Sequence, residues 1–415
     1  MFQDFRAANP LPAHSQLVSS PYGTPDHPLV PKRRGRGRGF GMFFGMVALT
    51  AGVFAVANLG EFLTSSGPDV VLRGGIAFSA DGLALVPYER TGSGGLIDEM
   101  RSDMFEARLA AVDLASGETR WDVKLAGELE WDAAALAAGA EYAYLATEDG
   151  LQIRDLDDGA LVTDDVPGLE YAGSGTAAYG FDPAAGIIAL DVDGGFHSIA
   201  LDTLEAVPAD PAVAEAWTGR LFAEGAYPEF GGMTSTSASI GEERTLNVEQ
   251  AAAAGLGSTL AVEDGGDRRA LGTRVYYEAG IVLDQTTVSD AWDIDVDQLI
   301  SGMLSDPESA AELAFPAAPA AGAASGHALI EHRTAPGGED FTLTVVDLDT
   351  GQATASLATA DHLGRSMTGP GGYTVVIAAP AEGIFQSDLV IVAPDGSVDR
   401  AVFGEFDLLG EPDLD

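Results

Sequence analysis

Carboxylates are the most abundant side chains that could do chemistry in this sequence. The 415 residues include 64 Asp and Glu, 21 Lys and Arg, six His and no Cys. Asp293, Asp295 and Asp297 have the spacing of the first three ligands of an EF-hand calcium loop. That loop also needs Gly at its sixth position and Glu at its twelfth, where this chain has Gln298 and Leu304. We therefore predict no metal site there.

Histidine placement and the lack of cysteine exclude most other site chemistry. Without Cys there is no thiol catalysis, no disulfide and no Cys-ligated metal. His327 and His332 lie in one predicted strand at an odd spacing, so they face opposite sides of a sheet and cannot share a metal ion. No Gly-x-Ser-x-Gly, Walker loop or Gly-x-Gly-x-x-Gly occurs. The sequence predicts no catalytic residue, metal ligand or cofactor. Glycosidases use a pair of carboxylates, but carboxylates are so numerous here that no particular pair can be assigned this role.

The start of the chain changes from basic to apolar. An uncharged run from Gly39 to Gly60 follows a basic cluster, and about 20 apolar residues suffice for a helix to cross roughly 30 Å of hydrocarbon. We predict a transmembrane helix over residues 39–62, and the positive-inside rule places a disordered tail, residues 1–38, in the cytoplasm. A cleaved signal peptide is the alternative, because Ala55-Val56-Ala57 resembles a cleavage site. The cluster comprises Lys32, Arg33, Arg34, Arg36 and Arg38.

The rest of the chain is strongly acidic. The first 38 residues hold six of the 21 basic side chains and two of the 64 acidic ones. An acidic field repels nucleic acid and anionic lipid surfaces, so we predict neither as a partner. This order of segments is typical of a single-pass plasma-membrane protein whose C-terminal domain lies outside the cell, after a linker at residues 63–74.

A weak strand–turn–strand repeat runs through residues 75–408. Its turns recur at a period of about 40–50 residues, which is typical of a β-propeller. Asp and Gly in these turns suit hairpins, since both tolerate positive φ. We predict an all-β propeller of roughly six to eight blades, with seven favoured, and a short tail at residues 409–415. The five turns end near positions 117, 159, 204, 351 and 396.

The clearest copy of this repeat is Ala111-x-Asp113-x-x-Ser116-Gly117-x-x-x-Trp121. It resembles the tryptophan-docking repeat of the quinoprotein (PQQ-like) propeller superfamily. The resemblance implies that Trp121 stacks between neighbouring blades and that Asp113 and the turn residues fix the hairpin. Thr163 and Ala355 stand at the tryptophan position in two later copies. The cofactor is not implied, because the vicinal cysteine pair of quinoprotein dehydrogenases is missing. The anchored layout also resembles membrane-tethered propellers of actinobacteria.

Several segments interrupt the repeat. Helical spacing predicts helices within Asp210–Gly225, within Asn247–Gly255 with Asn247 as cap, and within Asp293–Leu313. The loop Glu89–Phe105 mixes charged and apolar residues, and it either docks a partner or closes over the edge of the first blade. Its candidate docking residues are Glu89, Arg90, Asp98, Arg101 and Asp103.

Propellers bind through loops on one face of a rigid scaffold, and here a short linker holds that scaffold near the membrane. The sequence favours a binding or scaffolding module for another envelope protein or a wall component. Two alternatives stay open. One is an enzyme on the propeller face, either carbohydrate-active or a degenerate quinoprotein, and the other is a sensor domain.

Overall fold

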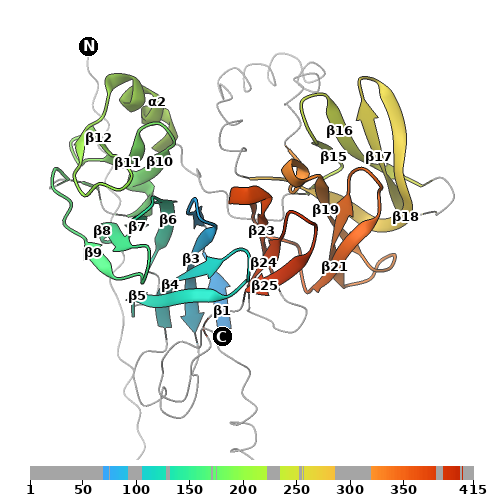
Figure 1. Cartoon of the computed structure of the whole chain (residues 1–415), viewed down its shortest axis with the longest axis horizontal. Coiled ribbons are helices and arrows are strands. Elements are labelled where there is room, and N and C mark those ends of the chain that lie inside the picture. The colour runs from blue at the N-terminus through green and yellow to red at the C-terminus, as the bar shows by residue number, and fades with distance from the viewer. Residues whose placement is uncertain are drawn as a thin grey trace, which may run out of the picture. The chain divides into compact units, whose positions relative to one another are not determined.

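The computed structural model describes residues 69–73, 75–91, 105–127, 131–169, 172–173, 175–221, 234–251, 255, 257–285, 319–379, 387–401 and 404. These residues belong to one compact unit, Ser66–Asp415. They form antiparallel β-sheets joined mainly by short turns, with one α-helix in this part of the chain (Figure 1). No helix among the described residues is long and apolar enough to cross a membrane. The predicted tail and transmembrane helix, residues 1–62, lie outside them.

The first sheet has the strand order β1-β3-β4-β5, with β2 also paired to β3. Strands β3 and β4 are buried along nearly their whole length, and short apolar runs of this kind are typical of strands covered on both faces. The strands are β1 (Asp69–Leu72), β2 (Ala77–Phe78), β3 (Leu83–Thr91), β4 (Phe105–Asp113) and β5 (Thr119–Ala126).

Three further sheets have four strands each, in the orders β6-β7-β8-β9, β10-β11-β12-β13 and β22-β23-β24-β25. Consecutive strands pair in all three, so the chain runs up and down. Their bounds are β6 (Ala133–Ala138), β7 (Tyr142–Thr147), β8 (Gly150–Asp155), β9 (Leu161–Thr163), β10 (Tyr179–Asp182), β11 (Gly186–Leu190), β12 (Phe196–Ile199), β13 (Val207–Pro208), β22 (Ser366–Thr368), β23 (Thr374–Ala378), β24 (Asp388–Val392) and β25 (Val398–Ala401).

The remaining sheet has eight strands and divides into two halves at its longest strand, β18. The first part of β18, up to Tyr277, pairs with β17, and its end pairs with β19 from Tyr277 onward, with a bulge between Tyr277 and Gly280. Glu278 lies in this bulge with φ 48°, a left-handed conformation that turns the strand from one half to the other. The strands are β14 (Thr234–Ser235), β15 (Ser237–Ser239), β16 (Arg244–Gln250), β17 (Gly257–Asp264), β18 (Asp267–Val282), β19 (His327–Arg333), β20 (Phe341–Asp347) and β21 (Ala353–Thr359).

Hydrophobic clusters join most of the four-stranded units to a neighbour, but among the described residues none joins the β10–β13 sheet to the β15–β18 half. Trp121 of the first sheet packs with Leu145 of the β6–β9 sheet, which in turn shares a cluster with the β10–β13 sheet. The first sheet also packs against the β22–β25 sheet, where Val86 and Ile391 share a core. Further clusters join β22–β25 to β19–β21 and the two halves of the eight-stranded sheet to each other. The first and last sheets in the sequence therefore pack together, and the fold is all-β and propeller-like.

The sequence predicted many of these elements. Within the described residues the sheets make six four-stranded units, when β18 is counted in both halves. The number of propeller blades stays a prediction. The helix expected after Asp210 is α2 (Pro211–Leu221), and the Asp210 carboxylate accepts a 2.9 Å hydrogen bond from the Ala212 N–H at its start. Short 3-10 helices occur at Thr176–Ala178, Ala323–Ser325 and Pro370–Gly372.

Two local predictions were wrong in detail. Asn247 does not cap a helix: it lies within β16, paired with Ser237 on one side and Ala261 on the other. The first sheet starts at Asp69 in β1, inside the segment predicted as a linker. The helices expected within 293–313 and the tail 409–415 lie outside the described residues.

Candidate functional site

Each four-stranded unit has two edges at which its strands are connected. We call the edge with the connection between the second and third strands the loop edge; in the first sheet this is the β3–β4 side. We call the opposite edge, with the connection between the third and fourth strands, the turn edge; in the first sheet this is the β4–β5 side. Because neighbouring strands are antiparallel, a side chain near the end of β3 lies at the loop edge together with one near the start of β4.

The turn edge holds the motif that the sequence picked out. The Asp113 carboxylate accepts hydrogen bonds from the N–H groups of Ala115 (2.9 Å) and Ser116 (3.2 Å), and its carbonyl accepts one from Gly117 (2.8 Å). Gly117 has φ 75°, which favours glycine, and Ala111 is a buried strand residue paired with Trp121. At Asp155–Gly159 and Asp347–Gly351 an Asp carbonyl likewise accepts from the N–H of the Gly four residues later.

Trp121 links the turn edges of two neighbouring sheets. Its indole N–H donates to the carbonyl of Leu156 at 2.9 Å, in the turn after β8, and its side chain is almost fully buried. A Cβ on Gly159 would lie 2.7 Å from the indole ring, so the ring rests directly on the glycine of that turn. The structure thus places this tryptophan against the next sheet.

Other donors make similar contacts between different sheets. The Arg269 guanidinium in β18 donates to the carbonyl of Leu348 at 3.2 Å. Leu348 directly follows Asp347 in its turn, just as Leu156 directly follows Asp155. In β21 the Thr354 hydroxyl donates to the carbonyl of Gly396 at 3.0 Å. The expected tryptophan equivalent Thr163 donates instead to Asp165 in its own loop. These turn edges are used for packing sheets together.

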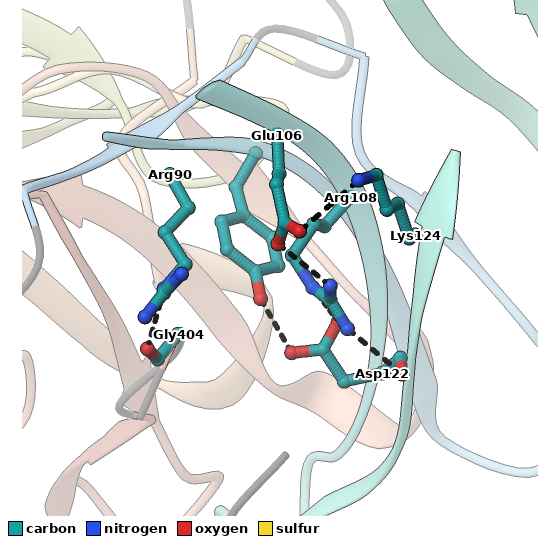
Figure 2. Close-up of polar contacts among 7 residues, drawn as sticks. Arg90, Glu106, Arg108, Asp122, Lys124 and Gly404 are labelled. Carbon is teal, nitrogen blue, oxygen red and sulfur yellow. Dashed lines mark hydrogen bonds and ion pairs between the residues drawn. The ribbon is translucent and has the colours of Figure 1, made fainter. Parts of the chain in front are cut away.

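The loop edge of the first sheet carries a cluster of charged side chains (Figure 2). The Arg108 guanidinium donates through Nε to Asp122 at 2.9 Å and through Nη1 to Glu106 at 2.9 Å. The second Glu106 oxygen accepts from the Lys124 ammonium at 3.2 Å. The Tyr88 hydroxyl donates a short hydrogen bond to the other Asp122 oxygen. We call these five residues the charged cluster.

Strand register explains why these side chains meet. Tyr88 and Arg108 are directly opposite each other on β3 and β4, and Arg108 is opposite Lys124 on β5. Glu106 and Asp122 lie two positions along their strands from Arg108 and Lys124, so all five project from one face of the sheet. That face also carries the core shared with the β22–β25 sheet. The charges therefore lie where the apolar interface reaches the loop edge.

Burial decides the electrostatics of the charged cluster. The side chains of Arg108 and Asp122 are 6% and 4% exposed, whereas that of Lys124 is 36% exposed. Burial and the Asp122 carboxylate raise the pKa of Tyr88, which stays a neutral donor. Burial opposes the charge of Arg108, but Asp122, Tyr88 and Glu106 together outweigh it, and the pKa of Arg108 is raised. Burial likewise raises the pKa of Asp122, although Arg108 opposes the rise.

This arrangement suits recognition better than proton transfer. Both oxygens of Asp122 accept hydrogen bonds, one from Tyr88 and one from Arg108, so the carboxylate is held in a fixed position. Lys124 brings a positive charge to the surface of a chain that has only one other lysine, Lys32. Each cation of the cluster is paired with a carboxylate, and Lys124 is the member that reaches the surface.

Other sheets also carry hydrogen-bonded carboxylates at their loop edges. Buried Glu331, near the end of β19, accepts from the His362 ring at 2.7 Å and from the Leu363 N–H at 2.6 Å. Asp388, at the start of β24, pairs with Arg400 at 3.4 Å. Burial raises the pKa of Asp388 in spite of the Arg400 guanidinium.

The predicted docking loop is only partly described. Glu89 and Arg90 lie at the end of β3, where Glu89 pairs with Arg73 on the face opposite the charged cluster. Arg90 is on the same face as the cluster, and its Nε donates to the carbonyl of Gly404 at 3.0 Å (Figure 2). Asp98, Arg101 and Asp103 lie outside the described residues. Sequence analysis did not identify Arg108 or its partners. The available signal was charge alternating with apolar residues on β4 and β5, with Lys124 among them.

Within the residues that the structure describes, no group of three or more His, Asp or Glu side chains could hold a metal ion. No protein-family model and no curated protein matches this sequence.

Some solved structures show a remote likeness to the chain. The isopeptidase AtxE2 with Astexin3-dC4 bound has a TM-score of 0.40 at 9% identity, over 83% of this chain and 53% of that one. A puromycin-hydrolyzing peptidase from Mycobacterium tuberculosis has a TM-score of 0.28 at 16% identity, over 82% and 57%. The β-propeller domain of the Trilobed protease from Pyrococcus furiosus has a TM-score of 0.21 at 8% identity, over 81% and 84%.

The chain thus spans about half the length of the isopeptidase that it resembles. At TM-scores this low, the likenesses carry no argument about activity. The propeller-like description rests on the chain's own sheets and their packing.

Proposed function

We propose that this chain is an extracytoplasmic binding or scaffolding module, held at the plasma membrane by residues 39–62. Its sheets are propeller blades of the tryptophan-docking kind, and its partner is another envelope protein or a wall component. The docking of Trp121 on Gly159 supports this type of blade. The basic and apolar start of the sequence supports the anchor.

The distribution of charged side chains supports the loop edge, rather than the turn edge, as the binding surface. Charged side chains gather at the loop edges of the β1–β5, β19–β21 and β22–β25 units, while turn edges such as those at Gly159 and Gly396 pack against a neighbouring sheet. A side chain already packed against a neighbour is not available to a partner. Binding residues commonly lie on loops that a rigid scaffold positions, so the loop edge of the first sheet is the proposed contact.

Photo-crosslinking in the intact envelope tests this assignment. A photo-reactive residue is placed at position 124, near the loop edge of β5, or at position 120, near its turn edge. The side chain of Arg120 is 54% exposed, so this control position reaches solvent as well. We expect crosslinks to an envelope protein or wall fragment from position 124 only. Equal crosslinking from both positions, or none from position 124, would contradict the proposed edge.

Thiol labelling tests which side of the membrane the C-terminal domain faces, and the absence of cysteine from the sequence removes background labelling. With Ser116→Cys in the exposed turn after β4, the introduced thiol is the only one in the chain. A membrane-impermeant maleimide should label this variant in intact cells. Labelling that requires cell lysis would show that the domain faces the cytoplasm.

A further inference from the structure

A row of hydrogen-bonded side chains crosses the β19–β21 half of the eight-stranded sheet, away from the charged cluster. The Ser356 hydroxyl on β21 lies 3.0 Å from the Thr344 hydroxyl on β20, which lies 2.9 Å from His332 Nε2 on β19. His332 and Thr344 are buried, whereas Ser356 is exposed on the outermost strand. The row therefore connects a buried imidazole with a hydroxyl at the surface.

The other ring nitrogen of His332 sets the direction of every hydrogen bond in this row. Nδ1 lies 2.9 Å from the carbonyl oxygen of Arg333, which can only accept, so Nδ1 carries the proton. In the neutral ring Nε2 is then an acceptor. The Thr344 hydroxyl must donate to it, and its oxygen is left to accept from Ser356. Ser356 thus donates to Thr344, and Thr344 donates to His332 Nε2, which is the base at the end of the row.

The surroundings keep this base neutral. Burial lowers the pKa of His332, with a further contribution from the Arg274 guanidinium, although the bond to the Arg333 carbonyl opposes the change. The Tyr276 ring also packs against the imidazole in a T-shaped arrangement, with centroids 5.1 Å apart. Arg274 and Tyr276, both on β18, are the charged and titratable side chains that the structure places against it. Neither can accept a proton from the imidazole at neutral pH.

We propose that Ser356 is a nucleophilic serine, served by His332 as general base through the Thr344 hydroxyl, and that it reacts with carboxylic esters. The Ser356 oxygen bonds to the acyl carbon, and the bond from that carbon to the alkoxy group breaks. The serine proton passes to Thr344 while the threonine proton passes to His332 Nε2. The same path returns a proton to the leaving alkoxide. Water then cleaves the acyl-serine by the same route and releases the acid.

A fluorophosphonate probe tests the proposal on the full-length protein. The probe forms a bond from phosphorus to the serine oxygen and releases fluoride, so an intact-mass shift and peptide mapping locate the adduct. We expect the adduct on Ser356 and its loss in Ser356→Ala, an exposed substitution that leaves the core unchanged. Ser397 is the matched control. It is also exposed and hydrogen-bonded, but to the Asp395 carboxylate, so it should stay unlabelled.

Two variants test whether labelling of Ser356 depends on proton transfer through Thr344 and His332 or only on the exposure of Ser356. Thr344→Val keeps the shape of the side chain and both end residues but removes the bridging hydroxyl, so labelling of Ser356 should fall by at least about tenfold. His332→Gln should cause a similar fall. Equal labelling of the wild-type protein and folded Thr344→Val, or no adduct on Ser356, overturns the proposal.

The pH dependence of the Ser356 labelling rate distinguishes a base at His332 from a purely structural role of that histidine. Because the pKa of His332 lies below the ordinary 6.5, the labelling rate should stay level through that pH and fall only below it. A rate that already halves above pH 6.5 contradicts a base in this environment. Failure of the probe would leave the crosslinking test of the loop edge unaffected.

Discussion

Removing the Trp121 side chain should weaken the packing between the first two sheets by a measurable amount. The indole is 6% exposed, donates one hydrogen bond to Leu156 and rests on Gly159. Truncation of a buried tryptophan to alanine costs about 3–5 kcal/mol. Trp121→Phe keeps most of the apolar surface and leaves the Leu156 carbonyl without its donor, which costs about 1–3 kcal/mol. We therefore expect the order wild type, Trp121→Phe, Trp121→Ala in falling stability.

The partner glycine allows a stricter test. Gly159→Ala introduces a Cβ at φ 73°, 2.7 Å from the indole, so it should destabilise the wild-type protein. Once Trp121→Ala has removed the ring, the clash between the ring and that Cβ disappears, and the backbone strain and a 3.0 Å approach to the Val123 side chain are left. The double variant should therefore be more stable than the sum of the two single changes predicts, by about 0.5–3 kcal/mol.

Urea unfolding of the full-length protein in detergent, followed by far-UV circular dichroism, measures these free energies. Arg120→Ala is the control, since Arg120 is on the same strand with a side chain that is 54% exposed, and it should change stability by less than about 0.5 kcal/mol. The docking argument is refuted if Trp121→Ala costs no more than this control. Strict additivity with Gly159→Ala would refute the contact between the two residues.

Three other perturbations follow from the same structure. Asp122→Asn leaves the buried Arg108 short of a counter-charge and should lower stability by about 3–5 kcal/mol, measured by urea unfolding. A threonine hydroxyl and backbone N–H groups hold the pKa of Asp347 below its ordinary 3.8, so its stabilising effect is present above that pH and lost below it. The stability difference between wild type and Asp347→Asn should therefore shrink in urea titrations below pH 3.8. Asp202→Ala removes the carboxylate that binds backbone N–H groups of the turn at residues 139–142, whose hydrogen exchange should accelerate.

Local patterns predicted the elements whose interactions are themselves local. The short apolar run Tyr142–Thr147 between turn signals is typical of a strand covered on both faces, and it forms β7, which is buried from Ala143 to Thr147. Helix α2 begins after Asp210 as expected, since an Asp cap followed by Pro211 needs no distant partner. The Asp and Gly turns were predictable for the same reason: their hydrogen bonds close within five residues, as from Asp113 to Gly117.

Elements defined by distant partners were not predictable in this way. The Ala-rich stretch at Asn247 resembles a helix start, but pairing with Ser237 and Ala261 on both sides makes it a central strand. The charged cluster depends on the register of β4 and β5, which contains bulges between Ala107 and Arg108 and between Ala111 and Val112. A one-residue shift of that register would move the partner of Arg108 to the opposite face.

The repeat looks degenerate in sequence because different residues can donate the hydrogen bond that joins one sheet to the turn of the next. What the turn carbonyl needs is a donor that reaches it from the neighbouring sheet, and an indole N–H, a guanidinium and a hydroxyl all meet that need at Trp121, Arg269 and Thr354. The turn itself has fewer solutions, because positive φ favours glycine and the preceding N–H groups need a short acceptor such as Asp. The turn residues therefore persist along the chain while the docking residue varies. A search for the turn, rather than for its tryptophan, is the better way to find such units in a sequence.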